Sequence, residues 1–372
     1  MLNENIFRND EKAIFNLRSL YRRFGYTRFK MSKFEEYDLY VRNKDFLISD
    51  GIITFTDTNG RLLALKPDVT LSIIKNAKDT KGAVEKLYYN ENVYRISSDS
   101  HSFKEINQTG LECIGDISLY DICEVLYLAV KSLETIDKNY MLDVAHAGLV
   151  SALIGACNLS ADIKKTVFDS IRNKSIDEVS SLFQKEIIDN FSYGIISKLM
   201  STYKTCNEVA EAFSGISAEA DAQLKEFSAI CNSLVELGLT DKIRIDFSMV
   251  SDTSYYSGIV FKGYISGIFT SVLSGGQYDK LMKKMGKSSS AVGFAVYLDT
   301  LERHGNKKAD YDYDFVIIKD DSCSSSAVIK TVESLSENGF SVIVLSEIPK
   351  NIRYKSLMKL TKDGLVGAGW SL

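Results

Sequence analysis

The feature that most constrains the fold is a helical stretch that interrupts a strand-rich chain. From about residue 150 to residue 238, apolar residues recur at helical spacing and strand patterns are hard to find. One clear apolar stripe consists of Leu224, Phe227, Cys231 and Leu234. Strand patterns precede this stretch and resume after it. The sequence therefore predicts an α+β domain that carries a helical insertion at about 150–238.

The segments before the insertion predict alternating helices and strands. Residues 10–24 form an amphipathic helix that ends at Gly25, and Asn59-Gly60 supplies the two positive-φ positions of a type I′ hairpin turn. Pro67 fits the first position of a helix. The expected elements are strands at 27–31, 86–96 and 108–115, a hairpin at 54–65, and helices at 10–24, after Pro67 and at about 119–136.

The segments after the insertion predict a second group of strands and a small C-terminal unit. The expected elements are a strand at 242–248, a hairpin at 255–264 and 268–273 around Gly267, a helix after Gly275-Gly276 and another at about 291–303. Residues 305–308 read as a linker. A β-α-β-α-β unit follows at 315–318, 327–337, 340–345, 353–360 and 365–366. We therefore expect a main domain at 1–305 and a small α/β unit at 310–372.

Composition argues against several classes of function. The net charge of −4 and the pI of about 5.6 do not predict a strongly basic nucleic-acid surface. The six cysteines form no Cys-x-x-Cys pair and the three histidines are scattered, so no metal site is predicted. Neither an apolar targeting core at the N-terminus nor an apolar run of about 18 residues occurs. We expect a cytoplasmic protein with reduced cysteines and no membrane span.

A carboxylate and a hydroxyl stand close together after Lys66-Pro67. Asp68 and Thr70 offer acceptors of the kind that an amino-acid ammonium group requires, since an ammonium group has three donors and no acceptor. Alternatively, the two residues only charge and cap the start of a helix.

Two polar residues lie four apart on a predicted strand. Gln108 and Glu112 face the same side of that strand, so both can point into one pocket. Arg95 lies near the end of the preceding predicted strand. A solvated polar face is the alternative reading of this strand.

An aromatic pair and a glycine pair complete the candidate set. Tyr255 and Tyr256 offer rings that can stack on a flat group and hydroxyls that can donate a hydrogen bond, although an aromatic at strand spacing can equally belong to the core. Gly275-Gly276 would let the backbone approach a ligand closely, or would form a plain tight turn.

Over about residues 8–303 these segments resemble the class II aminoacyl-tRNA synthetases, specifically the histidyl branch. They are most similar to a group of histidyl-synthetase paralogues, the regulatory subunits of ATP phosphoribosyltransferase. The resemblance implies an antiparallel sheet flanked by helices. It also implies that Asp68 and Thr70 bind the α-ammonium group, that Glu112 faces the imidazole and that Arg95 meets the phosphate. Gln108, Tyr255 and Tyr256 would complete a histidine pocket.

The sequence departs from the synthetase pattern mainly at positions that would serve ATP. Ser251 and Thr300 stand where the enzymes carry arginine, Ser97 replaces a glutamate, and Gln277 replaces another arginine. The loop 98–102 also lacks arginine. Adenylate formation needs cations that meet the charge developing on phosphate, and each loss typically costs a few kcal/mol of transition-state stabilisation. We therefore predict no catalytic residue in this chain.

The resemblance then implies a non-catalytic regulatory subunit that needs no cofactor. It would form a homodimer through the main domain, assemble with a short-form catalytic subunit, expected as a hetero-octamer, and take L-histidine as its effector. Residues 310–372 resemble a shortened anticodon-binding domain without a basic cluster, so no nucleic-acid partner is expected. Two alternatives remain: a divergent histidyl-tRNA synthetase or other class II amino-acid ligase, and a stand-alone amino-acid-binding module.

Overall fold

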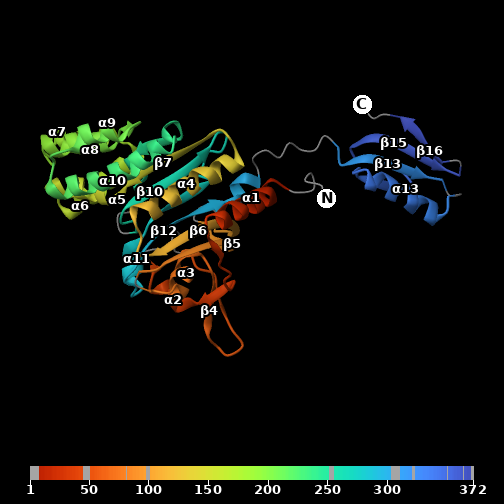
Figure 1. The fold of residues 1–372 in the computed structure, drawn as a ribbon, viewed down its shortest axis with the longest axis horizontal. Helices are drawn as coiled ribbons and strands as arrows, with labels where there is room; N and C mark the ends of the chain where they lie inside the picture. The colour runs from red at the N-terminus through yellow and green to blue at the C-terminus, as the bar shows by residue number, and fades with distance from the viewer. Residues whose placement is uncertain are drawn as a thin grey trace. The chain divides into compact units, whose positions relative to one another are not determined.

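The computed structural model describes residues 8–44, 51–80, 82–97, 101–250, 255–302, 311–320, 323–349, 351–362 and 364–369. These residues fall into two compact units, one within Asp10–His304 and the other within Met1–Asn9 and Gly305–Leu372. Figure 1 presents the fold with its elements labelled.

The larger unit is built on one nine-stranded sheet. In spatial order its strands are β1 (Thr27–Arg28), β5 (Val84–Ile96), β6 (Phe103–Gly115), β12 (Ser290–Tyr297), β11 (Leu273–Gln277), β10 (Ile259–Ile265), β7 (Tyr140–His146), β9 (Ile243–Asp246) and β8 (Thr202–Tyr203). The pairs β1–β5 and β7–β9 are parallel and the other neighbours are antiparallel. The predicted α+β class with an antiparallel-rich sheet is confirmed.

Two helices cover one face of this sheet, α1 (Asn9–Arg23) and α4 (Leu119–Ile136). The hydroxyl groups of Tyr21 in α1 and Ser132 in α4 lie 3.0 Å apart, and the ring of Tyr21 packs edge-on against Phe294 of β12. Because side chains alternate along a strand, Gly293 and Ala295 face the opposite side of the sheet. That opposite side carries the candidate site.

The helical insertion lies between β7 and β9 in sequence. Its helices are α5 (Ala147–Ala156), α6 (Ala161–Asn173), α7 (Ile176–Gln184), α8 (Asn190–Leu199), α9 (Cys206–Phe213) and α10 (Ala218–Glu236), the yellow-green group in Figure 1. Five of them begin with a side chain that accepts a hydrogen bond from the backbone of the first turn, which stabilises a helix N-terminus. The capping residues are His146, Ser160, Asp189, Thr205 and Ser217. None of the helices in the described part of the chain combines the length and apolar character of a membrane span.

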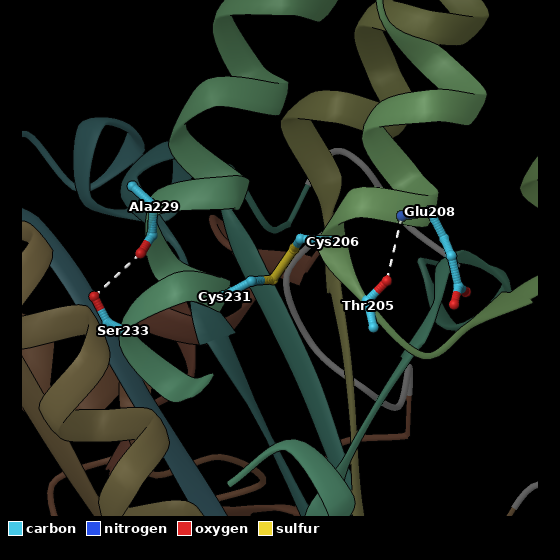
Figure 2. Close-up of a disulfide and its surroundings, with 6 residues drawn as sticks. All are labelled: Thr205, Cys206, Glu208, Ala229, Cys231 and Ser233. Atoms are coloured by element: carbon cyan, nitrogen blue, oxygen red, sulfur yellow. Dashed lines mark hydrogen bonds between the residues drawn. A yellow bond between two sulfur atoms is a disulfide. The ribbon is translucent and has the colours of Figure 1, made fainter. Parts of the chain in front are cut away.

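A disulfide joins two helices of the insertion. Cys206, the first residue of α9, pairs with Cys231 of α10, and their Cα atoms lie 6.3 Å apart (Figure 2). The expectation that the cysteines are reduced is therefore wrong for this pair. The two residues are separated by 25 positions in sequence, and only the packing of α9 against α10 brings them together. Cys113, Cys123, Cys157 and Cys323 are free.

Two strands differ from the expected elements. β7 was not anticipated, although it lies next to β10 and β9 in the sheet. β12 and the short helix α12 (Leu298–Glu302) occupy the segment expected to be one helix at 291–303. The apolar run of β12 is buried between β6 and β11, and such a run does not distinguish a buried strand from a buried helix by periodicity.

The hairpin around Gly267 is also shifted. Its second strand is β11 (Leu273–Gln277), so Gly275 and Gly276 lie inside a strand, and the alternative of a tight turn is wrong. The helix α11 (Asp279–Lys284) follows directly.

A three-stranded sheet, β2-β4-β3, holds the segment before the site. Its strands are β2 (Phe34–Glu36), β4 (Leu62–Leu65) and β3 (Thr54–Thr56), and the helix α2 (Tyr37–Val41) follows β2. The predicted hairpin is present, but its type I′ turn is not, because only Gly60 has a positive φ, of 80°. Asp57 instead accepts from the backbone N–H groups of Asn59 and Arg61 and organises a five-residue loop, 57–61.

The helix expected at Pro67 begins three residues later, as α3 (Thr70–Asn76), with Val69 at its N-cap. The Asp68 side chain accepts from the backbone N–H of Leu71 at 2.9 Å. Pro67 and Asp68 therefore precede the helix and belong to the wall of the cavity described below.

The smaller unit has a four-stranded sheet, β14-β13-β15-β16, and one helix. The elements are β13 (Tyr313–Lys319), α13 (Ser325–Glu337), β14 (Val342–Leu345), β15 (Tyr354–Thr361) and β16 (Gly364–Gly369). The second helix expected at 353–360 is in fact strand β15, which pairs in parallel with β13. Leu357 and Met358 are adjacent apolar residues, so this segment does not show the strict alternation that would distinguish a strand from a helix.

Candidate amino-acid binding site

A cavity opens on the sheet face opposite α1 and α4, and its empty space, including the open mouth, is about 480 Å³. Strands β5, β6, β11 and β12 and the segments around Asp68 and Tyr256 form its walls. All seven candidate residues from the sequence line it: Asp68, Thr70, Arg95, Gln108, Glu112, Tyr255 and Tyr256. The structure thus brings together four segments that are far apart in the sequence.

Glu112 is the most deeply buried acid of the cavity, with 2% of its surface exposed. Its Oε1 accepts from the Thr70 hydroxyl at 2.9 Å and its Oε2 accepts from the Tyr278 hydroxyl. Burial raises the pKa of Glu112 to about 8, while the two hydroxyl donors act in the opposite direction. No cation from the described residues pairs with it, so the carboxyl group suits a ligand that brings a donor or a positive charge.

Asp68 is a second carboxylate in the same cavity. Burial raises its pKa, and the backbone N–H of Leu71 and the guanidinium group of Arg95 oppose that rise. Arg95 is oriented by its own bond, because its Nε donates to the Pro67 carbonyl at 2.9 Å. Asp68 and Arg95 therefore form a charged edge of the cavity, with Glu112 deeper inside.

Gln108 lies on β6, four residues before Glu112 and on the same face of the strand, and only 3% of its surface is exposed. Its side-chain amide makes no hydrogen bond with the described residues, so it can donate to a ligand and accept from it. Gln108 and Glu112 face the cavity as the period of the strand predicts.

Tyrosine rings enclose the two carboxylates. Tyr255 and Tyr256 lie with ring centroids 4.6 Å apart in an edge-on arrangement, and Tyr278 is 6.3 Å from Tyr255. Burial, together with the nearby acids, raises the pKa of Tyr255 and Tyr278 well above the usual range, so both stay neutral hydroxyl donors. A flat, donor-bearing group such as an imidazole matches this enclosure.

Glycines make room for these rings and for Glu112. A Cβ on Gly276 would lie 2.6 Å from the ring of Tyr256, and a Cβ on Gly293 would collide with the Glu112 carboxylate. Both glycines lie in central strands, β11 and β12. The cavity therefore depends on the absence of side chains at these two positions.

Four further residues with polar side chains line the cavity and were not among the candidates: Tyr89, Ser274, Tyr278 and Tyr297. Tyr278 directly follows the Gly275-Gly276-Gln277 segment, and its position there was the available signal. Tyr89, Ser274 and Tyr297 lie inside strands, and nothing in their local sequence distinguishes them from core residues.

The positions that depart from the synthetase pattern are used for local structure where the structure describes them. Thr300 donates its hydroxyl to the Tyr297 carbonyl at 2.6 Å, and the Gln277 amide donates to Asp279 at 2.8 Å. The backbone N–H of Ser97 donates to Ser102 at 2.9 Å. Ser251 lies outside the described residues. The described chain also contains no group of three or more His, Cys, Asp or Glu side chains that could hold a metal ion.

Comparison with known proteins identifies the family. A family model described as histidyl-tRNA synthetase matches residues 2–301. The ATP phosphoribosyltransferase regulatory subunit of Clostridium kluyveri is 28% identical over 87% of this chain and 85% of its own length. The protein of that name from Clostridium botulinum strain Langeland is 30% identical over 77% of this chain and 69% of its own length.

Solved structures share the fold. The ATP phosphoribosyltransferase regulatory subunit/histidyl-tRNA synthetase from Bacillus halodurans aligns with a TM-score of 0.74 and 20% identity, covering 94% of this chain and 93% of that one. A chain of the ATP phosphoribosyl transferase complex from Thermotoga maritima aligns with a TM-score of 0.63 and 20% identity, covering 78% of this chain and 98% of that one. The chain thus belongs to the histidyl-tRNA synthetase family and, within it, to the ATP phosphoribosyltransferase regulatory subunits.

Proposed function

We propose that this chain is the regulatory subunit of a short-form ATP phosphoribosyltransferase, without catalysis of its own, and that L-histidine bound in the Glu112 cavity is its effector. The observation that carries the proposal is the composition of the cavity. A buried carboxylate (Glu112), a partly buried one (Asp68), a free amide and neutral tyrosines surround it. By contrast, Gln277 and Thr300, which stand where the enzymes carry arginine, bond to neighbouring groups of the chain.

The cavity offers a partner for each polar end of histidine except the carboxylate. Asp68 and Thr70 would accept from the α-ammonium group, and Glu112 with Tyr278 would bind the imidazole. Gln108 would hold the ligand between them. The described lining thus retains groups that can recognise an amino acid. Its one cation is Arg95, whereas a triphosphate would need several.

Regulation requires more than binding. Histidine shifts an assembly toward an inhibited state only if it binds the two states with different affinities. We propose that the chain dimerises through its larger unit, joins the catalytic subunits in a cytoplasmic hetero-octamer, and binds no nucleic acid. The names of the relatives support the partnership, and one of the fold relatives is a chain of a phosphoribosyl transferase complex.

Reconstitution tests the proposal. The purified chain and a short catalytic subunit should form one complex, with its mass measured by native mass spectrometry. The complex should make phosphoribosyl-ATP and lose that activity as histidine is added. The chain alone should give no histidine-dependent ATP–pyrophosphate exchange. Clear exchange by the chain alone would make it a synthetase or ligase, and histidine binding without association would make it a separate binding module.

A further inference from the structure

The charge of the cavity is incomplete for a zwitterionic ligand. An amino acid brings an ammonium group and a carboxylate, and the cavity lining supplies two acids, Asp68 and Glu112. Arg95 is the one cation among the lining residues; its Nε donates to the Pro67 carbonyl and its charge lies beside Asp68. A second cation within reach of the cavity would therefore balance the charge of a ligand carboxylate.

Lys262 of β10 lies on the face of the sheet that carries the cavity. Its strand is next to β11, which lines the cavity. The register pairs Ala295 with Ser274, Ser274 with Lys262, and Lys262 with Asp143. Paired residues share a face, and Ala295 and Ser274 both line the cavity. The four-carbon stem of a lysine is longer than the about 4.8 Å between neighbouring strands, so the ammonium group can reach over Ser274.

Lys262 has no partner among the described residues. Its cross-strand neighbour Asp143 is occupied, because Arg244 binds both carboxylate oxygens, with Nε to Oδ1 at 2.8 Å and Nη2 to Oδ2 at 2.6 Å. Lys262 makes no hydrogen bond or ion pair with the chain that the structure describes, although it is more than half buried. Burial lowers its pKa and Asp143 only partly opposes this. A half-buried ammonium group without a partner is costly and would be stabilised by an anion.

We propose that Lys262 binds the α-carboxylate of the amino acid held in the Asp68–Glu112 cavity. The assignment rests on the proposed function of this cavity and deepens it. Lys262 would supply, from β10, the positive charge that the segment containing Ser251 lacks, and it would select an amino acid over an amine of the same shape. It is a specificity-determining residue rather than a catalytic one.

Calorimetric titration of the full chain with L-histidine and L-histidinol tests the assignment. Histidinol keeps the imidazole and the amine but carries a hydroxymethyl group in place of the carboxylate. The wild-type chain should prefer histidine. Lys262→Met should weaken histidine binding about 10-fold or more and leave histidinol binding within about twofold, since only the charged contact is lost. Lys262→Arg should retain the preference.

Matched variants make the result decisive. Lys165→Met removes an exposed lysine of α6 and should leave both affinities unchanged. Lys262→Gln provides a second neutral variant if Lys262→Met does not give the cooperative thermal unfolding of the wild type. An unchanged preference for histidine in a folded neutral variant would overturn the assignment, as would loss of the preference in Arg95→Met alone. If the wild-type chain binds neither ligand, the proposed cavity function fails together with the assignment.

Discussion

At the scale of single residues, Glu112 and its partners decide what the cavity accepts. Two hydroxyl groups bond to its carboxyl group, one from α3 and one from Tyr278, and no described cation neutralises it. Such an arrangement is stable when the carboxyl group is protonated or when a ligand brings a donor. Recognition and acid–base behaviour are therefore coupled at this residue.

Glu112→Gln should weaken histidine binding. The amide keeps the size of the side chain but cannot ionise to meet a positively charged imidazole, so the dissociation constant should rise about 10- to 100-fold. Calorimetric titration measures this. Glu211→Gln, at an exposed position of α9, is the matched control and should bind as the wild type does. Equal affinities of Glu112→Gln and wild type would show that the imidazole is held elsewhere.

The same substitution should change how stability depends on pH. Unfolded Glu112 loses its proton near the usual value of 4.5, whereas folded Glu112 keeps it until about pH 8. Between these values the unfolded state binds fewer protons, so a rise in pH favours unfolding. The free energy of unfolding, measured with urea, should fall with rising pH more steeply for the wild type than for Glu112→Gln. The difference in slope should be at most about 1.4 kcal/mol per pH unit in that window. A difference that is flat with pH would mean that the folded carboxyl group ionises normally.

At the scale of elements, the cavity is a property of the central strands. Gly276 of β11 and Gly293 of β12 pair with each other, and the space left by their missing side chains accommodates Tyr256 and Glu112. The strands are held in register by antiparallel pairing with β10 and β6. A small change in side-chain volume at these glycines therefore acts directly on the site.

Gly276→Ala should abolish histidine binding and destabilise the fold. The added methyl group would lie 2.6 Å from the Tyr256 ring and 2.7 Å from the Ile259 carbonyl, so the ring or the strand must shift. Overpacking of this kind typically costs about 1–3 kcal/mol. Gly155→Ala is the control, because its Cβ meets nothing within 4 Å and its place in α5 favours alanine by up to about 1 kcal/mol. The Tm should therefore fall for Gly276→Ala and rise for Gly155→Ala. A Gly276→Ala variant with a raised Tm that still binds histidine would contradict this prediction.

Some of the helices and strands could be predicted from the sequence pattern alone. Helix α4 follows its predicted bounds because its apolar stripe has a strong helical period. β5 was expected nearly in full, whereas β6 begins five residues before its predicted start at Gln108. β7 and β12 were not expected, because strands covered on both faces carry continuous apolar runs without a diagnostic period. The same limit applies at the site: the candidate residues do line one cavity, but Tyr89 and Tyr297 acquire their place only from strand pairing.

At the scale of the whole molecule, the larger unit combines an enclosed cavity with a fold related to synthetases. In a regulatory subunit, histidine must act on an equilibrium between assemblies rather than on a reaction in its own cavity. Affinity of the isolated chain and inhibition of the complex are then two measurements of one binding event. If this chain is the sensor, a change in the affinity of the isolated chain should therefore also change the inhibition of the complex.

Thermal stability and feedback should respond together to the cavity. Histidine at about 100 times its dissociation constant should stabilise the isolated chain by about 2.7 kcal/mol, seen as a rise in Tm. Glu112→Gln should lose most of that rise, and the reconstituted complex containing this variant should need correspondingly more histidine for half-maximal inhibition, while Glu211→Gln changes neither. If Glu112→Gln abolishes the rise in Tm but leaves the inhibition curve unchanged, the inhibitory histidine acts at another place, on the catalytic subunit or between subunits. The cavity would then bind histidine without being the feedback sensor. A site whose affinity is the same in the active and inhibited assemblies cannot shift the equilibrium between them.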